Sequence, residues 1–283
     1  MKLVDRLIEQ RPNQIVYHYT SPAGLLGILK TKTLWATSHF HLNDTLEFSR
    51  ATDLFRVELA NASFNEPELK LFDSLTERMK QQFFVASFSE HDDLLSQWRA
   101  YCQNGTGYAL GFAQDNPIFS SATDNAFNLI RCEYDSDEQQ KLCRVLIAEF
   151  RDFLKSKADL NVSNLAQQAK SLRQIYNWTF AFALLTSSFK NKGFFEESEW
   201  RLVSQYPDDP KLVAKLEYRT GRLGLTPYFS LPLSAAPTAA RFDRIVIGPA
   251  ANKKVAELSL RTCLKTYGFG EVEIECSDTS FRQ

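Results

Sequence analysis

The sequence predicts an α+β fold, and three observations lead to this prediction. Short runs rich in β-branched and aromatic residues, which are typical of strands, recur along the chain. Amphipathic helical stretches of unequal length separate these runs, unlike the regular alternation of a parallel doubly wound sheet. The 283 residues are 44% hydrophobic and 24% charged, which is an ordinary globular composition. We therefore expect one domain over residues 1–283, built on a mostly antiparallel mixed sheet.

The first elements are expected to be a helix and then a strand, a short helix and a second strand. The pattern at residues 3–10 predicts an amphipathic helix, and the β-forming residues at 15–19 predict a strand. Ser21 is a suitable N-cap for the next helix, and Pro22 fits its first position, where a missing N–H costs nothing. Residues 33–37 predict the second strand.

Two long helical stretches are expected to interrupt the sheet as insertions. The first covers about residues 44–82, with a break at residues 65–67. The second covers about residues 137–189 and carries two long helices, the first with an apolar stripe. The other expected strands are residues 83–88, 108–112, 129–134, 194–203, 242–247 and 272–276, and the other expected helices are residues 94–102 and 251–264.

Composition excludes several classes of function. The net charge of −1 gives no global basic patch for nucleic acid, and no apolar run is long enough to span a membrane. The five cysteines are widely spaced and form no CxxC pair, which favours reduced thiols and disfavours a zinc site. We therefore expect a cytoplasmic protein with no membrane partner and no metal site.

His18 lies in a strand directly before a helix-start signal, and two interpretations are open. It can be a partly buried histidine satisfied by a backbone group. Alternatively, the hydroxyls of Tyr19, Thr20 and Ser21 and the first N–H groups of the helix surround the imidazole and form a corner for a ribose or phosphate.

Glu197, Glu199 and Arg201 alternate along an expected strand, so their side chains share one face if Trp200 and Leu202 face the core. The same pattern is consistent with a solvated strand face carrying weak ion pairs. It is equally consistent with an arginine that holds one carboxylate ionised while the other contacts a ligand.

Several sequence blocks match a known family in order and spacing. They are YHYTSPAGLLGIL, LWATS, HLND, VASFSE, QWRAY, GYALGF, EESEWRL and RIVIGP. With these blocks the chain, from His18 to Gly248, resembles domain-of-unknown-function family 2971 of bacteria and phages. That family is distantly similar to the ADP-ribosyltransferase fold, which implies a split sheet that holds NAD in a cleft.

The resemblance implies a role for several residues. His18 would bind the NAD ribose, Glu199 would stabilise an oxocarbenium-like transition state, and Glu197 with Arg201 would orient Glu199. The middle motif position of such transferases has no single match here, and Trp35, Thr37, Ser38, Ser87 and Ser89 remain candidates for it. The expected catalytic residues are Glu199, Glu197 and His18, and the expected NAD-binding residues are His18, Tyr19, Thr20, Ser21, Trp35, Ser38, Ser87, Ser89 and Arg201.

The leading expectation is an enzyme that cleaves NAD and transfers ADP-ribose to an unknown acceptor, as a toxin or phage-defence effector. The first alternative is a non-enzymatic module that binds a nucleotide or a nucleic-acid end in the same cleft. The second is a scaffold whose polar groups form a buried structural network. In the first two cases we expect His18 and Glu199 to face one cleft. If they lie on opposite faces of the sheet, the roles carried over from the resemblance fail.

Overall fold

The structure is a computed structural model. It describes residues 2–41, 47–79, 83–102, 106–158, 165–204, 215–221, 224–249 and 252–279. Strands and helices are interleaved without a regular alternation, and the α+β class is confirmed. The strands are β1 (Val16–Thr20), β2 (Thr33–Ser38), β3 (Phe84–Ser89), β4 (Tyr108–Phe112), β5 (Phe127–Arg131), β6 (Glu199–Ser204), β7 (Leu216–Gly221), β8 (Gly224–Pro232), β9 (Arg244–Ile247) and β10 (Glu273–Cys276).

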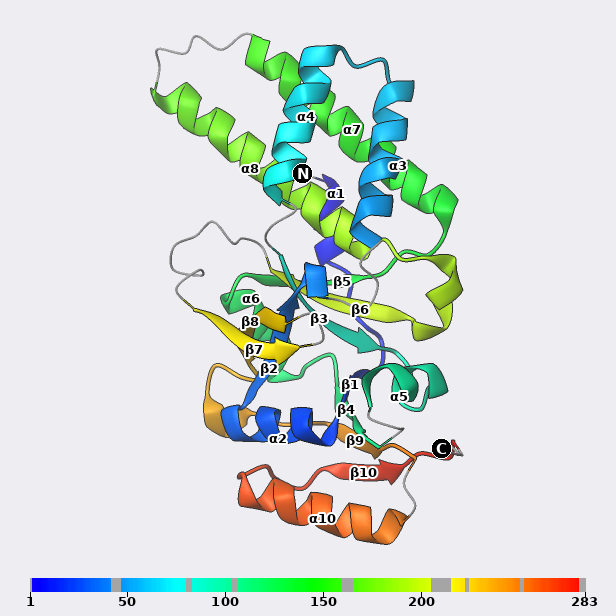
Figure 1. Ribbon diagram of the computed structural model, residues 1–283. Coiled ribbons are helices and arrows are strands. Elements are labelled where there is room, and N and C mark those ends of the chain that lie inside the picture. The colour runs from blue at the N-terminus through cyan, green and yellow to red at the C-terminus, as the bar shows by residue number, and fades with distance from the viewer. Residues whose placement is uncertain are drawn as a thin grey trace.

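The long helices stand beyond the sheet with the short helix α1 (Lys2–Ile8) next to them, and the other short helices lie beside the sheet (Figure 1). The other short α-helices are α2 (Pro22–Thr31), α5 (Leu95–Tyr101), α6 (Pro117–Asp124) and α10 (Lys253–Thr266), with the 3-10 helices η1 (His39–His41), η2 (Lys192–Glu197) and η3 (Pro237–Ala239). The long helices are α3 (Glu47–Asn61), α4 (Glu66–Met79), α7 (Ser136–Ala158) and α8 (Leu165–Ser188).

The ten described strands form one mixed sheet, mostly antiparallel as expected. Its main path runs β10-β9-β4-β1-β3-β2-β8-β7, and β6 joins β3 to β5 beside that path. Within this sheet only β9 and β10 pair in parallel. Helix α6 and the hairpin of β7 and β8 are not among the elements predicted from the sequence. Gly221 and Gly224 flank the tip of that hairpin, and Gly224 has a φ of 104°, which favours glycine.

The sheet divides at β3. Along one edge, residues 85–89 of β3 pair with β6. Along the other edge, β2 pairs with Phe84 and Val85 at one end, and β1 pairs with Ser89 at the opposite end. Among the described strands, none pairs with residues 86–88 on that edge. Strands β1 and β2 therefore diverge and leave an opening beside the middle of β3.

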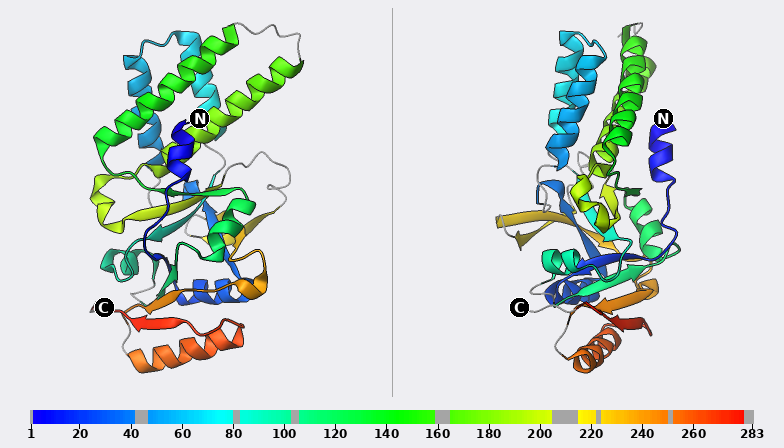
Figure 2. Two further views of the ribbon diagram at one scale, coloured as in Figure 1. Left: turned by 180° about the vertical axis from the view of Figure 1, so that it is seen from behind. Right: turned by 90° about the vertical axis from the view of Figure 1, so that its right-hand side faces the viewer.

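The buried apolar side chains of the described residues form three core clusters, and the two larger ones lie on opposite faces of the sheet. One core includes Trp200 and Leu202 of β6, Phe88 of β3 and the buried face of α2. The other core joins the opposite face of β5 and β6 to α1, α3, α4, α7 and α8. The two predicted helical insertions thus pack against each other as one helical layer, which stands beyond one end of the sheet (Figures 1 and 2).

The predicted strand over residues 194–203 is wrong in its first half. Residues 192–197 form the 3-10 helix η2, and β6 begins only at Glu199. Between them Ser198 adopts a left-handed conformation, with φ 41°. Glu197 therefore belongs to a turn and not to the strand face of Glu199 and Arg201. The predicted strand at 129–134 lies earlier, at 127–131.

Gly107 permits the chain to pass close to the end of α5. A Cβ atom added there would lie 2.7 Å from the Thr20 carbonyl oxygen and would overlap the Cys102 side chain. We expect Gly107→Ala to lower the free energy of unfolding by about 1–3 kcal/mol, because an overpacked backbone contact has to shift. Urea unfolding checks this. In the matched control Gly270→Ala, the added Cβ meets no atom within 4 Å, and equal losses in the two variants would contradict the prediction.

Candidate functional site

A cavity of about 680 Å³ lies at the division of the sheet. Most of the residues expected at the site line it. These are His18, Tyr19, Thr20 and Ser21 of the first strand and helix cap, Trp35 of β2, Ser87 and Ser89 of β3, and the carboxylates Glu197 and Glu199. Ser38 and Arg201 do not line the cavity. Of the candidates for the middle motif position, Trp35, Thr37, Ser87 and Ser89 all line it.

Strand pairing places His18 and Glu199 on opposite faces of the sheet. Tyr17 pairs with Ser89, and Ser89 pairs with Glu199, so these three side chains share one face. His18 follows Tyr17 and therefore points to the other face, where its ring lies 5.9 Å from that of Phe88. This placement on opposite faces counts against the roles that the resemblance implied for the pair. Both residues still line one cavity, since β1 and β2 diverge beside β3.

His18 closes part of this opening with its side chain. Its Nδ1 lies 2.9 Å from the carbonyl oxygen of Ser87, on the β3 edge that faces the opening. A carbonyl oxygen only accepts, so Nδ1 carries the proton, and in the neutral ring Nε2 is an acceptor. Burial lowers the pKa of His18, and the hydrogen bond to Ser87 opposes this only in part. The site thus contains a neutral imidazole with an accepting nitrogen.

We expect the His18 ring to remain neutral at pH 6.5, the ordinary pKa of histidine. Its lowered pKa means that the folded state binds this proton less readily than the unfolded chain does. Stability from His18 is therefore full above the unfolded pKa and falls as the pH decreases below it. Imidazole ¹⁵N and ¹H shifts of the wild type, assigned with His18→Gln, measure the titration. A ring that is protonated at pH 6.5 would contradict this.

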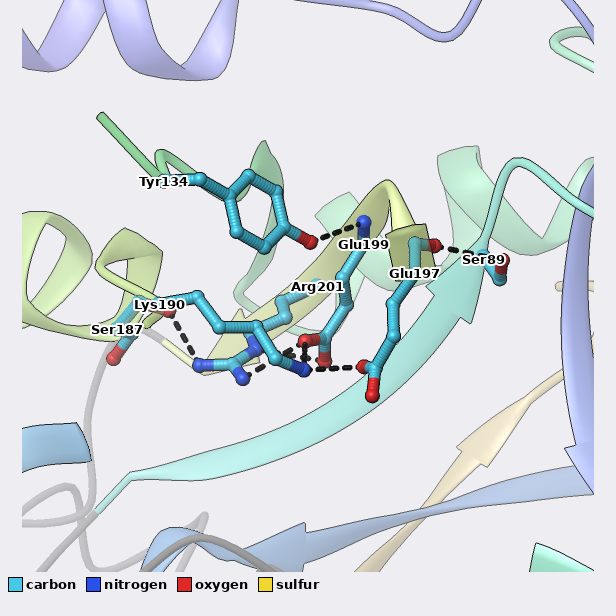
Figure 3. A network of polar contacts seen from close by, with 7 residues as sticks. All are labelled: Ser89, Tyr134, Ser187, Lys190, Glu197, Glu199 and Arg201. Carbon is cyan, nitrogen blue, oxygen red and sulfur yellow. Dashed lines mark hydrogen bonds and ion pairs between the residues drawn. The ribbon is translucent and has the colours of Figure 1, made fainter. Parts of the chain in front are cut away.

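Glu199 is the centre of a buried ionic network (Figure 3). Arg201 Nε donates to Glu199 Oε1 at 2.8 Å, and Arg201 Nη2 donates to Oε2 at 2.9 Å. Lys190 Nζ also donates to Oε2. The Glu199 N–H donates to the Tyr134 hydroxyl at 2.8 Å. Each oxygen of this carboxylate is thus held by a cation.

Glu197 joins the network from the adjacent turn. Its Oε2 accepts a hydrogen bond from Lys190 at 2.5 Å, and its carbonyl oxygen accepts one from the Ser89 hydroxyl at 2.7 Å. Within the described part of the chain, no hydrogen bond to Oε1 of Glu197 is found. Its side chain keeps 12% of its surface exposed, against 5% for Glu199. Glu197 is therefore the carboxylate with an oxygen available to a ligand.

The charges of the network balance, and this explains its pKa values. Burial alone would raise the pKa of Glu199, but Arg201 and Lys190 lower it to about 2. Burial alone would lower the pKa of Lys190, but Glu199 raises it above its ordinary value. Both groups are consequently charged at neutral pH. The solvated strand face that the sequence allowed is wrong, since Glu199 and Arg201 are 4% exposed.

The site also contains residues that were not predicted from the sequence. Lys190 follows the end of α8 and is brought to Glu197 and Glu199 by tertiary packing, which no local motif signals. Tyr134 lies after β5 and reaches Glu199 from outside the expected motif. Arg219 of β7 lines the far wall of the cavity. A β-hairpin that includes Arg219 could have been predicted from the sequence, because Gly221 and Gly224 separate two runs of alternating apolar and polar residues.

Two further findings concern metals and membranes. In the described ranges, no group of three or more His, Cys, Asp and Glu side chains is arranged to hold a metal ion. No helix of the described residues combines the length and apolar character needed to cross a bilayer.

Comparison with known proteins gives one match. The family model described as a protein of unknown function (DUF2971) matches residues 97–202, from α5 to β6. No curated protein and no solved structure matches the chain. The matched stretch contains Lys190, Glu197, Glu199 and Arg201 but neither His18 nor Trp35, and it includes the second predicted helical insertion. Over residues 97–202, the chain is therefore similar to this family of unknown function.

Proposed function

We propose that the protein binds NAD at the division of its sheet and cleaves the bond between nicotinamide and ribose. ADP-ribose then passes to an acceptor, in the manner of an ADP-ribosyltransferase. The observation that carries this proposal is the shared cavity of His18, Glu197 and Glu199. Its volume, about 680 Å³, lies within the usual range for small-molecule and cofactor sites.

The chemistry follows from the charges at the cavity wall. Cleavage of a nicotinamide–ribose bond develops positive charge on the ribose ring, and fixed carboxylates stabilise such charge. Glu197 supplies the accessible oxygen, while Lys190 and Arg201 keep Glu199 ionised behind it. The neutral His18 ring can accept a hydrogen bond from a ribose hydroxyl through Nε2. The bond from nicotinamide to the ribose carbon breaks, and nicotinamide leaves as a neutral molecule. The acceptor or water forms the new bond to that carbon and gives up its proton to a carboxylate or to solvent.

The direct test is to incubate the purified chain with NAD and to measure free nicotinamide by chromatography. We expect release in the wild type and a reduced rate in His18→Ala. Glu196→Gln serves as the matched control, because Glu196 is an exposed neighbour of Glu197 in η2. Absence of nicotinamide release across a set of offered acceptors would overturn the enzymatic proposal.

A second candidate function is a nucleotide-binding module without catalysis. One observation favours it: both oxygens of Glu199 are already occupied by Arg201 and Lys190. A carboxylate saturated in this way is suited to hold the turn of η2 in place. Calorimetry with NAD separates the candidates, since binding without any nicotinamide release supports the module. Absence of both binding and release supports a structural network only.

A further inference from the structure

Arg219 occupies the cavity wall formed by the β7–β8 hairpin and β2. Its guanidinium lies over the Trp35 ring, 5.2 Å from the ring centroid, and its Nη2 donates to Thr37 Oγ1 at 3.2 Å. Trp35, Thr37 and Arg219 all line the cavity. Strand pairing places Trp35 and Thr37 on the same sheet face as Glu199, because Thr37 pairs with Val85 and Val85 with Val203.

The positive charge of Arg219 has no carboxylate partner among the described residues. The nearest acidic residue on its own strand, Glu217, accepts a hydrogen bond from the Tyr228 hydroxyl at 3.1 Å instead. The Nε of Arg219 is buried and has no hydrogen-bond partner within the described ranges. Burial also lowers the pKa of Arg219 from its ordinary value, with no carboxylate opposing the shift.

An unsatisfied buried donor costs free energy. The Nε itself is closed off, so a ligand oxygen would bind the other N–H groups of the guanidinium. The other two cations near the cavity, Lys190 and Arg201, are already neutralised by Glu197 and Glu199. The cavity therefore has a carboxylate at one wall and, at the other, a guanidinium that no carboxylate of the described residues pairs with. A planar guanidinium held against an aromatic ring matches the geometry of phosphate oxygens.

We propose that Arg219, stacked on Trp35 and bonded to Thr37, binds the diphosphate of a nucleotide whose ribose end lies toward Glu197. The ligand class is thus a nucleoside diphosphate derivative, not a neutral nucleoside. This inference uses the cavity of the proposed function, and it concerns binding alone. It holds whether or not the bound molecule is cleaved.

The test compares two probes, ADP-ribose and adenosine, by titration calorimetry. We expect Arg219→Gln to weaken the binding of ADP-ribose by about tenfold or more, the usual effect of losing a charge-assisted hydrogen bond. Adenosine, which lacks the diphosphate, should bind with an affinity that changes less than about twofold. Arg219→Lys keeps the charge without the planar stack and should recover only part of the loss. Arg261→Gln, on the exposed face of α10, is the matched control.

Each outcome decides the inference separately from the proposed function. Loss of ADP-ribose affinity in Arg219→Gln without nicotinamide release from NAD in the wild type supports the subsite and overturns the enzyme. Nicotinamide release in the wild type together with unchanged ADP-ribose affinity in Arg219→Gln supports the enzyme and overturns the subsite. No ADP-ribose binding to the wild type, or equal losses for both probes, overturns the subsite. If Arg219→Gln does not fold, Arg219→Lys is measured in its place. An unchanged affinity of Arg219→Lys for ADP-ribose would then overturn the subsite.

Discussion

Replacing Glu199 by glutamine is expected to lower the free energy of unfolding by about 3–5 kcal/mol, because it removes one partner from a buried ion pair. The side chains of Glu199, Arg201 and Lys190 are each 5–6% exposed. The substitution would leave two buried cations and one carboxylate, Glu197, which contacts Lys190. The side-chain NH₂ group of glutamine would also face the N–H groups of Arg201 or Lys190, which are donors and cannot accept a hydrogen bond from it. Urea unfolding followed by circular dichroism measures the loss.

The matched control is Glu196→Gln, which removes an exposed carboxylate three residues earlier and should change stability by less than about 0.5 kcal/mol. The pH dependence gives a second check with a defined sign. Because the pKa of Glu199 falls from 4.5 to about 2, its stabilisation is present above pH 4.5 and is lost toward pH 2. The stability difference between wild type and Glu199→Gln should therefore shrink over that interval. A stability difference that stays constant between pH 4.5 and pH 2 would show that the ionised Glu199 carboxylate is not the cause of the stabilisation.

Replacing Glu197 by glutamine is expected to slow nicotinamide release by about 10²–10³-fold, the usual effect of removing one group that stabilises transition-state charge. Glu197 has the carboxylate oxygen that no described residue occupies. Lys190 keeps its second partner in this variant, since Glu199 also accepts from it. The melting temperature should therefore fall less than in Glu199→Gln. Initial rates at saturating NAD measure the effect.

Glu199→Gln alone is a poor test of catalysis, because a loss of activity would be confounded by unfolding. The informative comparison is the rate of folded Glu197→Gln against that of Glu196→Gln. An unchanged rate in folded Glu197→Gln would show that this carboxylate does not face the reacting sugar. The earlier assignment of Glu199 as the main catalytic residue stays a prediction, and the geometry favours Glu197 for direct contact.

Local patterns predicted most of the sheet and its helices for identifiable reasons. Ser21 caps α2 by accepting a hydrogen bond from the Gly24 N–H at 3.1 Å, as its position before Pro22 indicated. Trp200 and Leu202 lie in the core, as the alternation around Arg201 required. The prediction of a strand over residues 194–203 is wrong at its start, because Ser198 adopts a left-handed backbone conformation. This conformation is uncommon for a residue other than glycine.

The sequence by itself determined the α+β class, the strand before the capped helix and the alternation of Glu199 with Arg201, because periodicity and capping are local properties. Only the tertiary structure decided that Lys190 pairs with Glu197 and Glu199, and that Arg219 lies against Trp35. It also decided that His18 and Glu199 share a cavity from opposite faces of the sheet. The physical reason is that strand order and the division at β3 depend on non-local pairing, which no spacing along the chain encodes.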